Sequence, residues 1–288
     1  MKVVPFQIPK NVEEAFRVQV DDSTHLYNNL HQHPEIQLML IRESHGTVIA
    51  GDYIGRFRPG DLYIIGSNQP HVFRNDEVFF KEKLRAVCIS VYFDETTLGT
   101  AFWLLPEMKL LRQFIKDSAW GFQVKGEKKK ILEELLIQLT SVDGINKLIL
   151  FLEILRQLQT KKEMTPLSNT ATPRSIKVYD GVRLSKIIEF TFKEYHRHIS
   201  LTEVAALANL TPEAFCNYFK TRTRKTYINF LNEIRINHAC RLLAEDKIIA
   251  DVCYECGFTN LSNFNRVFKK FKKTSPAQFR NKKLKRTT

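Results

Sequence analysis

The sequence lacks the features of several protein classes. Its 288 residues include five cysteines and begin with no apolar signal segment, so we interpret the cysteines as reduced thiols rather than a disulfide framework. The most apolar stretch, residues 145–155, is too short to cross a bilayer. Neither the Gly-x-Ser-x-Gly motif of hydrolases nor the Gly-x4-Gly-Lys motif of phosphate-binding loops occurs. We therefore expect a cytoplasmic protein that is neither secreted nor inserted in a membrane.

Positive charge is abundant but confined to one part of the chain. Residues 181–288 hold 21 of the 44 lysine and arginine residues but 9 of the 31 aspartate and glutamate residues. This segment therefore carries +12 of the whole chain's net charge of +13. A basic segment joined to a nearly neutral one indicates a polyanionic partner, and nucleic acid is the leading candidate. The charge alone also leaves open an anionic membrane surface.

The first 95 or so residues have the pattern of short β-strands. Residues 36–41 form an apolar run, and apolar side chains alternate along residues 87–93 with the two-residue period of a half-buried strand. Turn signals such as Pro59-Gly60-Asp61 recur at short intervals. Short strands at this spacing predict an antiparallel sandwich or barrel.

Residues 107–161 have a helical pattern with two apolar faces. One face comprises Ile131, Leu132, Leu135, Leu136 and Leu139, and the other comprises Leu148, Leu152, Leu155 and Leu158. These faces either pack on the sheet or form a dimer interface, and the sequence leaves both possibilities open. Residues 162–182 contain two prolines and few large apolar side chains, which predicts a linker. We therefore predict domains over residues 1–161 and 183–288, joined by this linker.

The basic segment contains an internal repeat. The run Phe215-Cys-Asn-Tyr-Phe219-Lys220 matches Phe264-Asn-Arg-Val-Phe268-Lys269 at an offset of 49 residues. Each copy predicts a short helix, a tight turn and a second helix, which together form a helix-turn-helix unit. Ser200 and Glu203 have capping-box spacing in the first copy, and Gly257 supplies the turn in the second. The second helix of such a unit fits the major groove of DNA.

The exposed faces of the two second helices carry the candidate DNA contacts, while their phenylalanines are predicted to be core. Asparagine, arginine and serine suit hydrogen bonds to base edges, and lysine suits phosphates. The candidates are Glu213, Ala214, Cys216, Asn217 and Lys220 in the first copy, and Ser262, Asn263, Asn265, Arg266, Lys269 and Lys270 in the second. A longer helix over residues 226–244 is expected to hold both units on successive groove segments, about 34 Å apart.

Cys253 and Cys256 have the spacing of half a zinc site. No second pair accompanies them in the sequence, and His238 alone does not complete four ligands. We therefore predict two small apolar residues on a helix rather than a metal site.

The C-terminal sequence closely resembles the signature of AraC-type regulators of the AraC/XylS family. The resemblance covers about 100 residues and rests on Ile249-Ala-Asp-Val-Cys-Tyr-Glu-Cys-Gly257-Phe258, Phe264-x-Arg266-x-Phe268-Lys269 and Ser275-Pro276-x2-Phe279-Arg280. It implies two helix-turn-helix units that bind double-stranded DNA, often as a homodimer, with RNA polymerase as a further partner and no membrane. Lys273 and Arg224 stand where the family usually has glycine, which leaves the geometry of those turns open.

The N-terminal sequence resembles the sugar-sensing, cupin-like domain that often accompanies these regulators. The resemblance covers about 80 residues and rests on His31-x-His33-Pro34-Glu35-x-Gln37, Pro59-Gly60-Asp61 and Pro70-His71. It implies an effector pocket that contains His31, His33, Gln37 and His71. In catalytic cupins the equivalent histidines and a glutamate hold a metal, but here Gln37 replaces the glutamate and better suits sugar hydroxyls. A metal site and a structural role for the histidines remain alternatives.

These observations predict an α+β protein with an N-terminal antiparallel, cupin-like β-barrel, following helices and an all-α C-terminal domain with two helix-turn-helix units. The predicted function is a sequence-specific DNA-binding transcriptional regulator, an activator that responds to a small molecule such as a sugar. We expect no cofactor, no metal and no enzymatic activity. The alternatives are a metal-dependent cupin enzyme tethered to DNA and a regulator whose N-terminal domain only dimerises.

Overall fold

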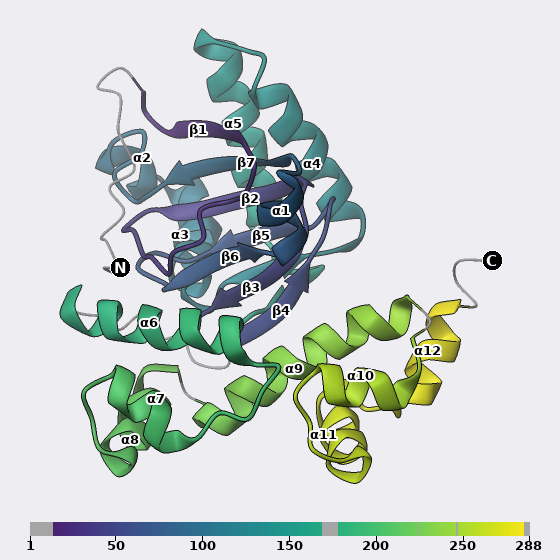
Figure 1. The fold of residues 1–288 in the computed structure, drawn as a ribbon. Coiled ribbons are helices and arrows are strands. Elements are labelled where there is room, and N and C mark those ends of the chain that lie inside the picture. Colours follow the sequence, from purple (N-terminus) through teal and green to yellow (C-terminus); the bar gives the residue numbers. More distant parts are fainter. Residues whose placement is uncertain (1–13, 169–177, 224, 246, 285–288) are drawn as a thin grey trace. The chain divides into compact units, whose positions relative to one another are not determined.

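The computed structural model describes residues 14–168, 178–223, 225–245 and 247–284 (Figure 1). The chain divides into two compact units between Gly181 and Val182. The first unit combines antiparallel sheets with helices, and the described part of the second is helical. The predicted combination of an N-terminal antiparallel sheet with a helical C-terminal region is therefore confirmed. No helix within the described residues is both long enough and apolar enough to span a membrane.

The N-terminal unit contains two antiparallel sheets. Six strands pair in the order β1-β7-β2-β5-β8-β9, and three pair in the order β4-β3-β6. The strands are β1 (Arg17–Ser23), β2 (Ile36–Glu43), β3 (Gly46–Ala50), β4 (Tyr53–Phe57), β5 (Leu62–Ile65), β6 (His71–Asn75), β7 (Ala86–Phe93), β8 (Phe122–Val124) and β9 (Met164–Pro166). The predicted barrel is not closed, because within the described residues the strands pair as two separate sheets.

Alternate residues of β2 belong to two different cores, which explains why this strand is buried on both faces. Leu38 and Leu40 pack with the helices that cover one face of the larger sheet. Met39 and Ile41 pack toward the smaller sheet, together with Phe73. The two-residue period of a strand sends neighbours to opposite faces, so one apolar run serves both layers. The unit therefore has three layers: helices, the larger sheet and the smaller sheet.

The helices of this unit are short in the earlier part of the sequence and longer in the later part. They are α1 (Glu77–Glu82), α2 (Thr100–Leu104), α3 (Lys109–Asp117), α4 (Gly126–Leu139) and α5 (Gly144–Leu158), with 3-10 turns at Pro106–Met108 and Ser118–Trp120. Helix α4 buries Leu132, Leu135, Leu136 and Leu139 as predicted. Helix α5 packs instead through Phe151, Ile154, Leu155 and Leu158. The predicted face through Leu148 and Leu152 is therefore wrong in part, because α5 is apolar around much of its circumference and packing selects the face.

Two short strands correct the prediction for residues 107–182. Strand β8 interrupts the stretch that was predicted to be helical, and it pairs with both β5 and β9. Strand β9 lies within the predicted linker, so residues 162–168 belong to the edge of the larger sheet. Strands of three residues leave no measurable period in the sequence, and only tertiary pairing defines them. The rest of the predicted linker includes residues 169–177, which lie outside the described residues.

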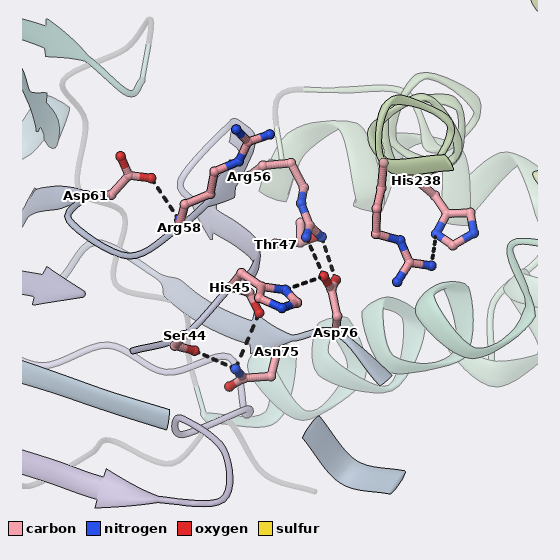
Figure 2. Close-up of polar contacts among 10 residues, drawn as sticks. Ser44, His45, Thr47, Arg56, Arg58, Asp61, Asn75, Asp76 and His238 are labelled. Carbon is pink, nitrogen blue, oxygen red and sulfur yellow. Dashed lines mark hydrogen bonds and ion pairs between the residues drawn. The ribbon is translucent and has the colours of Figure 1, made fainter. Parts of the chain in front are cut away.

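A polar cluster connects the smaller sheet to α1. Figure 2 shows Asp76, which precedes α1, between Arg56 of β4 and His45, which precedes β3. Its carboxylate accepts hydrogen bonds from both terminal guanidinium nitrogens of Arg56 and from Nδ1 of His45 at 2.8 Å. Burial acts to raise the pKa of Asp76, but these donors outweigh it and hold the pKa well below its usual range. Asp76 is therefore charged and contributes to folding near neutral pH.

The C-terminal unit consists of helices arranged around one long central helix. They are α6 (Val178–Glu194), α7 (Leu201–Leu207), α8 (Pro212–Thr223), α9 (Tyr227–Ala244), α10 (Ile249–Glu255), α11 (Leu261–Lys272) and α12 (Pro276–Leu284). Helix α9 lies between the pair α7 and α8 and the pair α10 and α11 (Figure 1). It buries ten residues, including Phe230, Ile234 and Ile236, and so connects the cores of both pairs.

Candidate nucleic-acid interface and histidine cluster

In the first helix pair, side-chain caps define where α7 and α8 begin. The Ser200 hydroxyl accepts a hydrogen bond from the backbone N–H of Glu203 at 3.1 Å. The predicted capping box is only half formed, because the Glu203 carboxylate pairs with Arg197 at 2.6 Å rather than turning back to the cap. Asn209 occupies the turn with a left-handed φ of 52°. Thr211 caps α8, because its hydroxyl accepts a hydrogen bond from the backbone N–H of Ala214 at 3.3 Å.

The second helix pair, α10 and α11, turns at Gly257. This glycine has a φ of 79°, and a Cβ there would lie 2.5 Å from the backbone oxygen of Tyr195. Only glycine fits both the left-handed conformation and this close approach. Asn260 caps α11 by accepting a hydrogen bond from the backbone N–H of Asn263 at 2.8 Å. The predicted helix, turn and helix are therefore present in both copies.

Lys273 ends α11 in the left-handed region, with a φ of 58°. The turn that the family usually makes with glycine therefore forms here with a side chain present. A left-handed conformation costs a residue other than glycine about 1–2 kcal/mol. Arg224, the other departure from the family pattern, lies outside the described residues.

The phenylalanines and the candidate DNA contacts lie on opposite faces of α8 and α11. Phe215, Phe219, Phe264 and Phe268 are fully buried, which confirms them as core. Ten of the eleven candidate contacts are exposed, and Asn263 is half-buried. The exposed candidates are Glu213, Ala214, Cys216, Asn217, Lys220, Ser262, Asn265, Arg266, Lys269 and Lys270. Each helix thus presents one continuous polar face.

Two of these side chains are held by hydrogen bonds that the sequence did not predict. Arg266 donates from Nη2 to the Asn263 side-chain oxygen at 2.8 Å. Lys270 donates from Nζ to the side-chain oxygen of Asn229, at the start of α9, at 3.1 Å. Asn229 is therefore an addition to the candidate interface. Asn229 and Lys270 are 41 residues apart in the sequence, so no local pattern predicted this contact.

Cys253 and Cys256 are fully buried in the core of the second helix pair. Burial raises the pKa of the Cys256 thiol far above its usual range. These cysteines pack with Phe258 and Val252. The prediction that both cysteines are small apolar core residues is therefore confirmed, and Cys253 lies on α10 while Cys256 follows the end of this helix.

Three histidines of the N-terminal unit converge between the two sheets. His31 and His33 precede β2, and His71 begins β6, which pairs with His31 through an isolated β-bridge. One possible ligand atom from each of the three lies within 4.8 Å of the others. Gln37 of β2 lies on the face of the larger sheet that carries Met39 and Ile41. The structure therefore brings together residues from both sheets that the sequence placed in one pocket.

The backbone fixes which nitrogen of each imidazole faces the others. Nδ1 of His31 contacts the Asn29 carbonyl at 2.8 Å, Nδ1 of His33 contacts the Glu35 carbonyl at 2.9 Å, and Nδ1 of His71 contacts the Gln69 carbonyl at 2.8 Å. A carbonyl only accepts, so Nδ1 carries the proton and Nε2 carries a lone pair in each neutral ring. Burial lowers the pKa of His31 to about 4 and that of His71 well below its usual value. Burial also lowers the pKa of His33, although Glu35 and Gln37 oppose the shift.

The amide of Gln37 is oriented by β7. Its Nε2 donates to the Ser90 hydroxyl at 2.9 Å and to the Tyr92 hydroxyl at 3.1 Å. Among the described residues, Gln37 Oε1, His33 Nε2 and His71 Nε2 are buried and have no hydrogen-bond partner. Ser90 and Tyr92 are therefore additions to the candidate site that the sequence did not predict. Their two-residue spacing along β7 was the available signal, since it places both on one face.

A cavity of about 370 Å³ lies beside this cluster. Glu35 and Tyr92 line it and also contact His33, through a 3.8 Å separation of the Glu35 carboxylate from Nδ1 and an edge-on ring contact. Arg17 and Asp94 also line the cavity. The four predicted effector residues are not among its lining residues, so the cluster and the cavity are adjacent sites with a shared wall.

Comparison with known proteins agrees with the two helix pairs. A family model described as a helix-turn-helix domain matches residues 204–282. The chain is 22% identical over 256 residues to the HTH-type transcriptional activator RhaS of Mannheimia succiniciproducens, which covers 87% of this chain and 88% of that protein. This chain therefore contains a helix-turn-helix domain of the AraC type over residues 204–282. It is therefore a DNA-binding regulator of transcription and not an enzyme.

Other regulators and solved structures are similar to this chain over different shares of its length. An uncharacterised HTH-type transcriptional regulator of Pseudoalteromonas carrageenovora is 34% identical over 86 residues, which is 30% of this chain and 51% of that protein. The solved structure of ToxT from Vibrio cholerae is 12% identical and covers 93% of this chain and 98% of that chain, with a TM-score of 0.35. The DNA-binding domain of AdpA in complex with a target DNA is 24% identical and covers 36% and 95%, also with a TM-score of 0.35.

Proposed function

We propose that this regulator reads a specific DNA sequence with the exposed faces of α8 and α11, each acting as the second helix of a helix-turn-helix unit. The observation that carries the proposal is the separation of faces: buried phenylalanines on one side and a continuous exposed polar set on the other. The excess positive charge of residues 181–288 supports a polyanionic partner. The side chains suit both parts of recognition, since Asn217, Asn265 and Arg266 match base edges and Lys220 and Lys269 match phosphates.

The test is DNA binding by the full chain at several salt concentrations. A selection from random-sequence duplexes should enrich two short half-sites, one for each reading helix, because each helix occupies one groove segment. The affinity should fall steeply with salt as lysine and arginine displace condensed counterions. Binding that is equally tight on every duplex would contradict sequence-specific reading.

The regulator is proposed to activate transcription in response to a small polar molecule that binds the 370 Å³ cavity. Its RhaS relative is named an activator, which supports activation and implies contact with RNA polymerase. Glu35, Arg17 and Asp94 give the cavity charged groups of both signs, which suit a hydroxylated ligand such as a sugar. Thermal unfolding of the full chain with a panel of sugars and sugar acids tests this, because a ligand of the folded state raises the midpoint. No shift with any of them would favour a domain that only dimerises.

A second copy of the chain is proposed to pack on α5. Ile145, Ile149 and Leu152 follow helical spacing and are 67%, 55% and 38% exposed. Such a stripe is typical of a helix–helix interface. It supports the dimer interface that the sequence left open as one of two possibilities. Sedimentation of Ile149→Glu against the unchanged chain tests it, and a dimer that persists in the variant would contradict it. As a regulator of transcription, the protein is proposed to act in the cytoplasm.

A further inference from the structure

We propose that Arg235 is a positioning residue that sets the orientation of α8 and α11 relative to each other, and thereby the spacing between the two DNA half-sites that the regulator accepts. Arg235 belongs to the central helix α9, and its side chain is buried. The inference rests on the proposed function, because a spacing has meaning only for a protein that reads two half-sites.

The guanidinium of Arg235 holds the backbone that connects α6 to α7. Its Nε donates a hydrogen bond to the carbonyl oxygen of Tyr195 at 2.8 Å, and its Nη2 donates one to the carbonyl oxygen of Arg197 at 2.6 Å. The donors of a guanidinium lie in one rigid plane, so a single side chain can hold both carbonyls, and lysine has no such fork. Arg235 therefore ties α9 to the segment that leads into the first helix pair.

The same guanidinium contacts the turn of the second helix pair. Its carbon lies 5.6 Å from the centre of the Phe258 ring, and Phe258 directly follows Gly257. A Cβ at Gly257 would lie 2.5 Å from the carbonyl oxygen of Tyr195, so this turn approaches the same backbone segment as closely as glycine permits. The Tyr195 carbonyl is therefore shared between Arg235 and the turn between α10 and α11.

These contacts extend to both helix pairs. The Arg197 side chain donates from Nη2 to the carboxylate of Glu203 in α7 at 2.6 Å, and α7 packs against α8. The Phe258 ring packs against Phe264 of α11, with 5.2 Å between the ring centres. A continuous series of contacts therefore runs from the first helix pair through Arg235 to the second reading helix.

The length of α9 does not by itself fix this orientation. An α-helix of 18 residues spans about 27 Å, which sets a separation between the elements at its two ends. Helices attached to one end of such a rod could still turn about its axis. The contacts of Arg235 prevent this rotation, because they join the segment before α7 to the turn before α11.

The first experiment measures binding of the full chain to the selected duplex and to duplexes with one or two base pairs inserted between the half-sites. Each inserted base pair turns one half-site by about 35° around the duplex. Binding two half-sites at once gains about 10²–10⁴-fold in affinity over one, and the wrong geometry removes this gain. Arg235→Lys should bind the selected duplex about 10-fold more weakly and discriminate less between spacings, while its affinity for a single half-site stays unchanged.

Arg241→Lys is the matched control. Arg241 belongs to the same helix, and its Nη2 contacts Nδ1 of His238 within that helix at 3.2 Å. This variant should keep the wild-type preference for one spacing. A smaller folded fraction lowers the affinity for every duplex by the same factor, so the spacing preference distinguishes positioning from stability. Equal losses on every duplex for Arg235→Lys would overturn the inference.

A second measurement needs no DNA. Spin labels on the exposed Cys216 of α8 and on Ser262→Cys of α11 report the distance between the two reading helices. The half-buried Cys240 is replaced by alanine in every sample, and the other cysteines are buried. Wild type should give one narrow distribution of distances, and Arg235→Lys a broader or shifted one. The same narrow distribution in both would contradict the positioning role.

Phe258→Leu keeps the test valid if Arg235→Lys does not fold. Leucine keeps an apolar side chain in the core but offers no aromatic face to the guanidinium. The distance distribution should broaden and the spacing preference should weaken, as in Arg235→Lys but to a smaller extent. A Phe258→Leu protein that matches wild type in both measurements would count against the inference.

The wild-type results separate this inference from the proposed function. Sequence-specific binding with equal affinity at every spacing would overturn only the role of Arg235. A narrow distance distribution that depends on Arg235, together with equal binding to every duplex sequence, would overturn the proposed function and leave the positioning role standing.

Discussion

The two units of this protein use polar residues in opposite ways. In the N-terminal unit the candidate polar side chains are buried between two sheets and oriented by hydrogen bonds, as in His33 and Gln37. In the C-terminal unit they are exposed on helices whose apolar faces carry the stability, as in Arg266 beside Phe264 and Phe268. A change at one of these candidate residues should therefore affect folding in the first unit and binding alone in the second.

The largest effect should come from the core beneath the DNA-reading face. Phe264→Ala removes a fully buried ring that contacts Phe258 and Phe268, and such truncations cost about 3–5 kcal/mol. Urea unfolding should show this loss, and DNA binding should weaken only as the folded fraction falls. Asn265→Ala, an exposed neighbour, is the matched control and should change stability by less than about 0.5 kcal/mol. A comparable loss in the control would remove the distinction between the two faces.

The next effect tests a half-buried charge in the N-terminal unit, the carboxylate of Asp76. Asp76→Asn removes the charged acceptor of Arg56 and His45 and should cost about 2 kcal/mol at pH 7. Because the folded-state pKa of Asp76 is lowered, this stability is fully present above the unfolded pKa of about 3.9 and is lost as the pH falls below it. Wild type and variant should therefore converge in acid. Asp22→Asn, which breaks an exposed pair with Arg85, should change little, and an equal effect would contradict the importance of burial.

A smaller effect tests exposed charge in the C-terminal unit. Arg266→Ala should weaken binding by about 1–3 kcal/mol at one base pair while the urea midpoint stays unchanged. Lys269→Ala should weaken binding similarly on every sequence and reduce the salt slope by about 1. Fluorescence anisotropy with single-base variants of the selected site distinguishes the two. Equal losses on all sequences for Arg266→Ala would make it a phosphate contact instead of a base reader.

The smallest effect concerns the backbone that ends α11. Lys273→Gly relieves a left-handed φ of 58° and should stabilise the chain by about 0.5–1 kcal/mol, visible as a higher urea midpoint. Lys269→Gly places glycine inside the same helix and should destabilise it by about 1 kcal/mol. A gain in stability from Lys273→Gly together with a loss from Lys269→Gly would show that the backbone conformation at each position decides the effect of glycine. A loss of stability in both variants, or a gain in both, would contradict backbone strain at Lys273.

The sequence predicted the C-terminal unit more completely than the N-terminal one. Ser200, Thr211 and Asn260 cap helices through side chains that contact a backbone group three residues later, so neighbouring residues contain the whole signal. The buried phenylalanines follow helical spacing for the same reason. In the N-terminal unit, β8 and β9 have three residues each and exist because other strands pair with them. The packed face of α5 was misjudged because its sequence offers more apolar residues than the core can accept.

The candidate sites differ in the same way, since the DNA-contacting faces could be predicted from the sequence more completely than the histidine cluster. Local patterns in the sequence are enough to predict the two helix pairs, the cap at Ser200 and the polar residues on the outer faces, because a helix fixes the relation of residues three or four apart. The sequence also named His31, His33, Gln37 and His71. Only the tertiary structure decided that these four residues converge from two sheets, and that Ser90 and Tyr92 orient the amide. That arrangement depends on strand register between segments more than 50 residues apart, which no local pattern in the chain records.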